Sequence, residues 1–349
     1  MKKNKSTNIV IPLKNDQVRL DSFPPVAVII PAYQADKHIL KVIAGIPTYV
    51  STIIVVNDGS HDRTAELVLG YTDKRICLIS HAKNQGVGAA VLTGYKKAVE
   101  LGAKIIVKMD ADGQMDPTYL IPLIAPILAN RADYTKGNRF LHATKLKTMP
   151  FIRRIGNIGL TFLTKAASGY WNVFDPANGY TAISAKIIPL ILNGRISRRF
   201  FFETSLLLEL GLIGAVVEDV SIPALYSDEK SHLNEWKALI EFPIKLIKGL
   251  FRRIIFQYYL RDFSAFSLLF VCGIFSFLFG VFWGIDFWIR SIRTEIVSST
   301  GTVMIAVLPI ILGTQFLLQA LMVDIQNIPM EPLSNTIDIK SLELYLKEK

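Results

Sequence analysis

The stretch KIIVKMDADGQMDP, residues 104–117, joins an apolar run to a cluster of oxygen-bearing side chains. The run is typical of a buried strand, and Asp110, Asp112 and Gln114 follow it at alternate positions. Because alternate side chains of an extended chain point to the same side, these three can converge on a hard divalent cation. We therefore predict that they bind Mg²⁺ or Mn²⁺ and leave coordination positions open for a diphosphate. The alternative is a solvated acidic turn, which a single Asp-x-Asp on its own would favour.

Strand-like and helix-like segments alternate along the N-terminal half of the chain. The apolar runs at 26–30, 52–56, 76–79 and 105–107 are typical of strands, and the segments at 37–46, 62–69, 88–101 and 117–128 are typical of helices. Strands that alternate with helices form a mostly parallel sheet with helices on both faces. Residues 20–230 are enough for one domain of this α/β class.

Polar residues follow three of the predicted strands, which is more than folding requires. Pro31, Tyr33 and Asp36 follow the first strand, Asp58 follows the second, and the predicted metal-binding triplet that begins at Asp110 follows the fourth. Ligands of open α/β sheets bind beyond the carboxyl ends of the strands, so we expect one shared crevice. There, Tyr33 would lie against a nucleobase, and Asp58 would accept hydrogen bonds from the base or the ribose.

A partial glycine fingerprint occurs in NQGVGAAV, residues 84–91. It follows the third predicted strand instead of the first, and it lacks the third glycine of dinucleotide-binding turns. We therefore reject it as a cofactor motif. Instead, Gly86 and Gly88 are predicted to allow tight packing of a strand against a helix.

The C-terminal third of the chain carries an excess of hydrophobic residues. Hydrophobic residues make up 51% of the 349, and no charged side chain occurs in residues 263–285 or 296–323. Both stretches exceed the roughly 20 residues that a helix needs to cross a bilayer. We therefore predict two transmembrane helices.

The charges beside these stretches predict the orientation in a membrane. The loop between the spans balances Arg290 and Arg293 with Asp286 and Glu295, whereas the segment before the first span is strongly basic. Its basic residues are Lys237, Lys245, Lys248, Arg252, Arg253 and Arg261. Since basic flanks stay in the cytoplasm, we expect a multi-pass protein of the cell membrane with both termini cytoplasmic. No apolar segment of signal-peptide length occurs in residues 1–16.

Residues 234–261 combine basic residues with apolar residues near helical spacing. This pattern predicts one or two amphipathic helices at the membrane interface, with Pro243 as the break. An ordinary amphipathic core helix is the alternative. The net charge of the chain is +10, and we expect its basic residues to interact with anionic lipid headgroups and not with nucleic acid.

Seven motifs together resemble family 2 glycosyltransferases. They occur in the family's order, and they are PAYQAD at 31–36, VNDGSHDRT at 56–64, NQGVGAAVLTGYKKA at 84–98, DADGQMDP at 110–117, KGNRF at 136–140, DPANGYTAIS at 175–184 and FFET at 201–204. The chain is most similar to the polyprenyl-phosphate branch, which includes dolichyl-phosphate mannose synthases and bacterial undecaprenyl-phosphate glucosyltransferases.

This resemblance implies a GT-A type nucleotide-diphospho-sugar transferase domain, with a Rossmann-like, mostly parallel sheet, followed by juxtamembrane and transmembrane helices. The expected parts are a mobile N-terminal tail at 1–22, a cytoplasmic catalytic domain at 23–232, amphipathic juxtamembrane helices at 233–262, two transmembrane helices within 263–323 and a cytoplasmic C-terminal tail at 324–349.

The resemblance also implies roles for individual residues. The metal ligands are Asp110, Asp112 and Gln114. The expected contacts to the nucleotide-sugar are Pro31, Tyr33, Asp36, Asp58, Asp110, Ala111 and Asp112. The expected contacts at the acceptor phosphate are Arg139, Arg153, Asn157, Glu203 and Lys230. Catalysis is assigned to Asp112, Arg139, Arg153 and Lys230.

Two positions depart from the family pattern. Asp36 stands where the family usually has glutamate. Leu225 or Tyr226 occupies the place of an arginine, so a cationic role passes to Lys230. The alternative for Lys230 is a solvent-facing loop lysine.

The implied reaction is the metal-dependent transfer of a hexose from a nucleotide-sugar to a polyprenyl phosphate, either undecaprenyl or dolichyl phosphate, with inversion. A UDP-hexose is the favoured donor and GDP-mannose the second option. A phosphate dianion needs cations to hold it in line but no strong base. Two alternatives stay open: a processive polysaccharide synthase, although the Gln-x-x-Arg-Trp signature is missing, and a catalytically silent scaffold that binds sugar lipids. Gly280 and Gly284 would permit a homo-oligomer through the first span.

Overall fold

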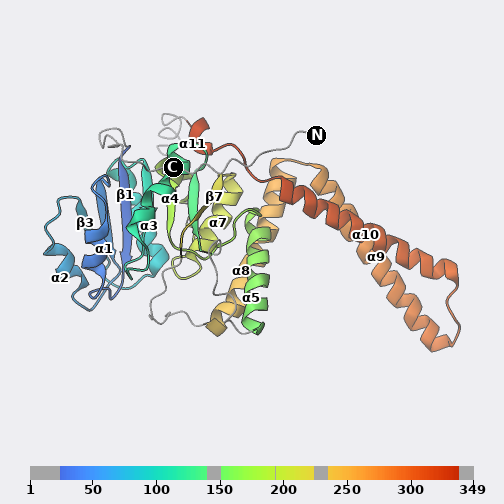
Figure 1. The fold of residues 1–349 in the computed structure, drawn as a ribbon. Coiled ribbons are helices and arrows are strands. Elements are labelled where there is room, and N and C mark those ends of the chain that lie inside the picture. Colours follow the sequence, from blue (N-terminus) through green and yellow to red (C-terminus); the bar gives the residue numbers. More distant parts are fainter. Residues whose placement is uncertain (1–23, 140–150, 193, 224–234, 338–349) are drawn as a thin grey trace.

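A seven-stranded mixed sheet forms the centre of the α/β domain in the computed structural model, which describes residues 24–139, 151–192, 194–223 and 235–337 (Figure 1). The strand order is β3-β2-β1-β4-β6-β5-β7, and only β6 runs antiparallel to its neighbours. The strands are β1 (Val26–Ala32), β2 (Thr52–Asn57), β3 (Ile76–Ser80), β4 (Ile105–Lys108), β5 (Tyr134–Asn138), β6 (Thr181–Ser184) and β7 (Val217–Ser221). The four strands predicted from the sequence are confirmed.

Helices cover both faces of this sheet. They are α1 (Ile39–Gly45), α2 (Thr64–Leu69), α3 (Val87–Glu100), α4 (Leu120–Leu128), preceded by a 3₁₀ turn at Pro117–Tyr119, α6 (Ile188–Ile191) and α7 (Phe202–Ile213). A further helix, α5 (Phe151–Ser168), packs against α7. Alternate side chains of β1 belong to two different cores: Ala27 and Ile29 pack with α3, α6 and α7, whereas Val28 and Ile30 pack with α1 and α4. An apolar strand buried on both faces explains why the run at 26–30 shows no polar alternation.

Helix α8 (Glu235–Ile255) passes through Pro243 without ending, so the predicted break is wrong. Its inner face packs against α5 and α7, where Leu246 is fully buried with Ala167 and Leu208. This packing holds the helical turn despite the hydrogen bond that a proline cannot donate. The chain continues as the π-helix η6 (Phe256–Arg261).

The outer face of α8 is apolar and exposed. Ile244, Ile247, Phe251 and Ile255 each expose between 42% and 59% of their surface. One helix therefore combines a face packed on the domain with an apolar face turned away from it. The predicted location of α8 at a membrane interface stays a prediction.

The two charge-free stretches fall in helices α9 (Ala265–Thr294) and α10 (Thr300–Gln326), which lie side by side and project from the α/β domain (Figure 1). Both are long and apolar enough to cross a membrane by length and composition. Glycines allow their close contact, because a Cβ on Gly280 would lie 2.6 Å from the Ala306 carbonyl oxygen, and one on Gly313 would lie 2.5 Å from the Phe277 nitrogen. Gly280 therefore packs within the chain, and an oligomer through these helices, which stays a prediction, would use another face.

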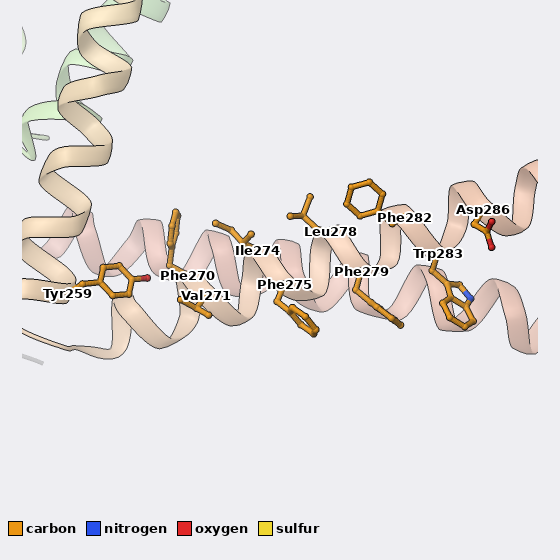
Figure 2. Close-up of a pocket in the computed structure, with 10 residues that line it drawn as sticks. All are labelled: Tyr259, Phe270, Val271, Ile274, Phe275, Leu278, Phe279, Phe282, Trp283 and Asp286. Carbon is orange, nitrogen blue, oxygen red and sulfur yellow. The ribbon is translucent and has the colours of Figure 1, made fainter.

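The side of α9 that faces away from α10 carries a groove of about 690 Å³ (Figure 2). It runs from Tyr259 to Asp286, and its apolar lining includes Phe275, Phe279 and Trp283. Such an uncovered aromatic and aliphatic surface is what contact with lipid chains requires.

The chain returns to the α/β domain after α10. The carboxylate of Asp133 accepts hydrogen bonds from the backbone N–H groups of Leu333 and Ser334, both at 2.8 Å, at the start of α11 (Leu333–Thr336). Lys186 Nζ donates to the Ser334 carbonyl at 2.7 Å. Both ends of the hairpin formed by α9 and α10 are thus held at the same domain. The predicted N-terminal tail lies outside the described residues, as does the predicted C-terminal tail beyond residue 337.

Candidate active site

The acidic turn follows β4 directly and brings Asp110, Ala111, Asp112 and Gln114 together. Gly113 adopts a positive φ of 75°, a left-handed conformation that glycine tolerates at little cost. Asp112 Oδ1 accepts the backbone N–H of Gln114 at 2.9 Å, and this contact closes the turn. Two carboxylates and one amide on a single turn form a set of hard oxygen donors.

Lys108, the last residue of β4, lies between two carboxylates. Its Nζ is 2.8 Å from Asp110 Oδ1 and 3.0 Å from Glu203 Oε1, and the residue is 1% exposed. Burial alone would lower the pKa of Lys108, but the two carboxylates outweigh it and raise the pKa above its ordinary value. Lys108 therefore stays charged, and it connects the acidic turn to Glu203 in the first turn of α7.

A second group of charges surrounds Arg139, which follows β5. Arg139 donates from Nε to Asp175 Oδ2 at 2.8 Å and from Nη2 to Asp175 Oδ1 at 3.1 Å. Asp175 is buried, whereas the Arg139 side chain is 42% exposed. Nearby, Lys136 is buried and donates from Nζ to the Asn178 carbonyl. Asp175 thus orients a solvent-accessible guanidinium group that is suited to a phosphate.

Lys136 predicts a pH dependence of stability. Burial lowers the pKa of Lys136 from its ordinary 10.5 to about 8. Between these two values the unfolded chain binds more protons than the folded one, so the free energy of unfolding should rise as the pH increases from about 8 to about 10.5. A Lys136→Met variant should lack this rise. Thermal unfolding of both proteins across this range checks the prediction, and parallel curves would contradict it.

Hydrogen bonds hold together the loops after β1 and β2 on the donor side of the site. The backbone N–H of Gln34 donates to Ser60 Oγ at 3.0 Å, and that of Asp36 donates to Asp62 Oδ2 at 3.1 Å. Pro31 lies within β1. Tyr33 lies just beyond the end of this strand and is 45% exposed. The exposed ring of Tyr33 is available for stacking on a base.

Asp58 has partners within the protein. It is 2% exposed, its Oδ1 lies 2.7 Å from His81 Nδ1, and its Oδ2 accepts the backbone N–H of Gly86 at 2.7 Å. The backbone N–H of Gln85 donates to Oδ1 at 3.0 Å. Asp58 therefore ties the loop after β3 to the end of β2, and its predicted contact with a nucleotide stays a prediction.

The glycine motif packs against a different partner from the one predicted. A Cβ on Gly86 would lie 2.5 Å from the Arg198 carbonyl oxygen, and one on Gly88 would lie 2.2 Å from that of Ser197. The close contact is thus with the segment before α7 and not with a strand. Gly94, farther along α3, makes the contact between helix and strand, because its Cβ would meet Ile29 Cγ2 of β1 at 2.4 Å.

Three of the predicted acceptor contacts involve side chains that lie outside the described part of the structure. Lys230 lies outside the described residues. Arg153 and Asn157 belong to α5, but their side chains are also outside the described part of the structure. Their roles stay predictions.

The acidic turn fits a hard divalent cation. Lys108 Nζ lies 2.8 Å from Oδ1 of Asp110, and Asp112 adds a second carboxylate. Within the described residues, no group of three or more His, Cys, Asp or Glu side chains could hold a metal. The fit therefore rests on the two carboxylates with the amide of Gln114, and further oxygen ligands would come from a bound diphosphate or water.

Sequence reasoning missed Lys108, Asp175 and His81. A lysine at the end of the otherwise apolar run IIVK was a usable signal, because lysine is rarely buried without a partner. Asp175 begins the motif at 175–184, but neither it nor His81 gave a signal for its partner, since Arg139 and Asp58 lie 36 and 23 positions away in the chain.

Comparisons with known proteins agree with this fold and this set of motifs. The model of glycosyl transferase family 2 matches residues 27–190. The UDP-N-acetylglucosamine–dolichyl-phosphate N-acetylglucosaminyltransferase of Methanococcus voltae is 34% identical over 187 residues, which cover 49% of this chain and 74% of that protein. The polyprenol monophosphomannose synthase of Mycolicibacterium smegmatis is 30% identical over 193 residues, which cover 51% and 69%.

A solved structure shares the fold. Glucosyl-3-phosphoglycerate synthase from Mycobacterium tuberculosis, in complex with Mn²⁺, uridine diphosphate and glucosyl-3-phosphoglycerate, aligns with a TM-score of 0.51 and 18% identity. The alignment covers 67% of this chain and 81% of that one. The chain therefore belongs to glycosyl transferase family 2 and is a glycosyltransferase with a GT-A type fold.

Proposed function

We propose that this glycosyltransferase moves a hexose from a nucleotide-sugar to a polyprenyl phosphate in the membrane. The observation that carries the proposal is the combination of an acidic turn and an oriented arginine with a domain that holds both ends of an apolar helical hairpin. Relatives named for dolichyl, polyprenyl and undecaprenyl phosphate acceptors support it. A UDP-hexose is the favoured donor, with GDP-mannose as the alternative.

The side chains suit a single displacement with inversion. A phosphate oxygen of the acceptor attacks the anomeric carbon while the bond from that carbon to the nucleotide diphosphate breaks. A divalent cation, held by Asp110, Asp112 and Gln114, would supply positive charge for the departing diphosphate. Arg139, which Asp175 orients at 2.8 Å, would hold the acceptor phosphate in line. Since that phosphate is mostly a dianion at neutral pH, no general base is required.

The hairpin and α8 would place the site at the membrane surface. The segments before α9 and after α10 both attach to the α/β domain, so they belong on the same side of the bilayer. The basic residues of α8 and η6 support the cytoplasmic side, and the exposed apolar residues of α8 suit the headgroup region. A lipid phosphate could then reach Arg139 while its polyprenyl chain stays in the bilayer.

The test is the transfer of radiolabelled sugar in detergent to undecaprenyl and dolichyl phosphate. A panel of UDP-sugars, including UDP-N-acetylglucosamine, and GDP-mannose is offered with Mg²⁺, with Mn²⁺ or with a chelator. Label in the lipid fraction only in the presence of metal is the expected result, and an inverted anomeric configuration is expected in the product. No lipid product from any donor, despite nucleotide binding, would favour a silent scaffold, and a retained configuration would contradict the single displacement.

A further inference from the structure

Asp324 is a buried carboxylate near the C-terminal end of the apolar helix α10. It is 5% exposed, and both of its oxygens have partners. Oδ1 accepts hydrogen bonds from Arg253 Nη1 at 2.8 Å and from Tyr258 Oη at 2.5 Å. Oδ2 accepts hydrogen bonds from Arg253 Nη2 at 2.9 Å and from Trp171 Nε1 at 2.9 Å. The end of the hairpin is thus joined to α8, to η6 and to the segment that follows α5. We call Trp171, Arg253, Tyr258 and Asp324 the hairpin clamp.

Arg253 completes the clamp from the side of the α/β domain. It is 2% exposed, and it donates from Nε at 3.1 Å and from Nη2 at 2.7 Å to the Ala166 carbonyl in α5. Its Nη1 also donates to Gln257 Oε1 at 3.2 Å. A planar guanidinium group can make these bonds together with a bidentate pair to a carboxylate, which a lysine cannot. Apolar residues of similar volume often stabilise such a joint as well as a buried ion pair does, so the role that we assign to this pair is to specify one arrangement of the joint.

Residues 169–178, which we call the connecting segment, lead from the clamp to the acceptor side of the site. The segment runs along the edge strand β7, and its hydrogen bonds reach alternate residues from Ala215 to Asp219. They run from Tyr170 Oη to the Ala215 carbonyl at 2.6 Å, from Asn172 Nδ2 to the Val217 carbonyl at 3.1 Å, and from the backbone N–H of Phe174 to Asp219 Oδ2 at 2.8 Å. Four residues after Trp171, Asp175 binds Arg139.

We propose that Asp324 is a positioning residue, and that the hairpin clamp and the connecting segment together fix the depth of Arg139 relative to the bilayer. This inference rests on the proposed function, because it concerns an acceptor whose phosphate is held at a fixed depth by its membrane-embedded chain. The clamp touches no reacting group. Its effect reaches the acceptor side through Trp171, the edge of β7 and Asp175.

The experiment uses the full chain in lipid nanodiscs that contain undecaprenyl phosphate. Asp324→Asn should lower kcat/KM for this acceptor by about 10- to 100-fold, as expected for a misplaced binding group. Binding of UDP, measured by calorimetry, should not change. In detergent, transfer to a short, water-soluble prenyl phosphate should stay near the wild-type rate, because that acceptor can diffuse to Arg139. Asp286→Asn is the matched control: this hairpin aspartate is exposed and pairs with Arg290 one turn away, so its loss should leave both rates unchanged.

A milder variant protects the test against misfolding. Trp171→Phe removes one hydrogen bond to Asp324 and keeps the ion pair, so it should lower transfer in nanodiscs in the same direction by a smaller factor. If Asp324→Asn no longer binds UDP and is therefore misfolded, the result for Trp171→Phe decides whether the clamp positions Arg139. Wild-type transfer to the embedded acceptor in the folded variants, or an equal loss with both acceptors, would overturn the inference.

A distance measurement keeps the inference separate from the proposed function. If wild-type protein transfers no sugar to any lipid, the proposed function fails. The clamp can still be tested by measuring the distance between spin labels attached to Leu69→Cys in α2 and Leu278→Cys in α9. These labels require prior replacement of Cys77 and Cys272. The clamp predicts a narrow distance distribution in the wild-type background and a broader one with Asp324→Asn. Equally narrow distributions would overturn it.

Discussion

Replacement of Asp112 by asparagine is expected to lower sugar transfer by about 10²- to 10³-fold without loss of the fold. The carboxylate accepts the backbone N–H of Gln114 at 2.9 Å, and an amide oxygen can accept the same bond, so the turn should keep its conformation. The negative charge is lost, and with it an oxygen ligand that would hold a divalent cation at the departing diphosphate. The measurements are the initial transfer rate, the thermal unfolding temperature and a titration with Mn²⁺ in the presence of UDP.

Asp116→Asn is the matched control for this prediction. Asp116 lies in the same stretch, and its Oδ1 accepts the backbone N–H of Thr118 at 2.9 Å at the start of the 3₁₀ turn. Asparagine serves this N-cap position as well as aspartate does, so near-normal transfer is expected. A wild-type rate for Asp112→Asn, or an equal loss for both variants, would contradict the role assigned to the acidic turn.

Much of the first half of the fold could be predicted because its signals are local. The strands at 26–30 and 52–56 are continuous apolar runs with helical segments after them, and the structure places them side by side as β1 and β2, parallel in the sheet. A parallel sheet covered on both faces needs little more than this alternation. The two long apolar helices, α9 and α10, could also be predicted, because their length and lack of charge set them apart from the rest of the chain.

The second half of the sheet depends on contacts between distant residues. Strand β6 has only four residues, and its antiparallel place between β4 and β5 follows from their pairing and not from its own pattern. The site shows the same limit. Lys108 and Glu203 are 95 positions apart, and their ion pair exists because α7 begins beside the end of β4. For Pro243 the local signal was present but wrong: proline predicts a helix break, yet the packing of α8 on α5 and α7 outweighs this preference.

Replacement of Gly179 by alanine should reduce both activity and stability. A Cβ at this position would lie 2.5 Å from Lys108 Nζ and 2.7 Å from Asp110 Oδ2. The ends of long side chains can usually move, but Lys108 is 1% exposed and held between two carboxylates, so a shift would separate it from Asp110 or Glu203. Overpacking of this kind typically costs about 1–3 kcal/mol of stability. Since Asp110 would also move, we expect transfer to fall by about 10- to 100-fold.

The rate of transfer and the free energy of unfolding, measured together, check this expectation, with Gly159→Ala as the control. A Cβ on Gly159 meets nothing within 4 Å, and alanine favours the helix α5 in which it lies, so this variant should be as stable as the wild type or more so and should keep its activity. If Gly179→Ala also kept full activity, the acidic turn would tolerate displacement of the Lys108–Asp110 pair. The donor site would then depend on Asp112 and Gln114 and not on the position that Lys108 gives to Asp110.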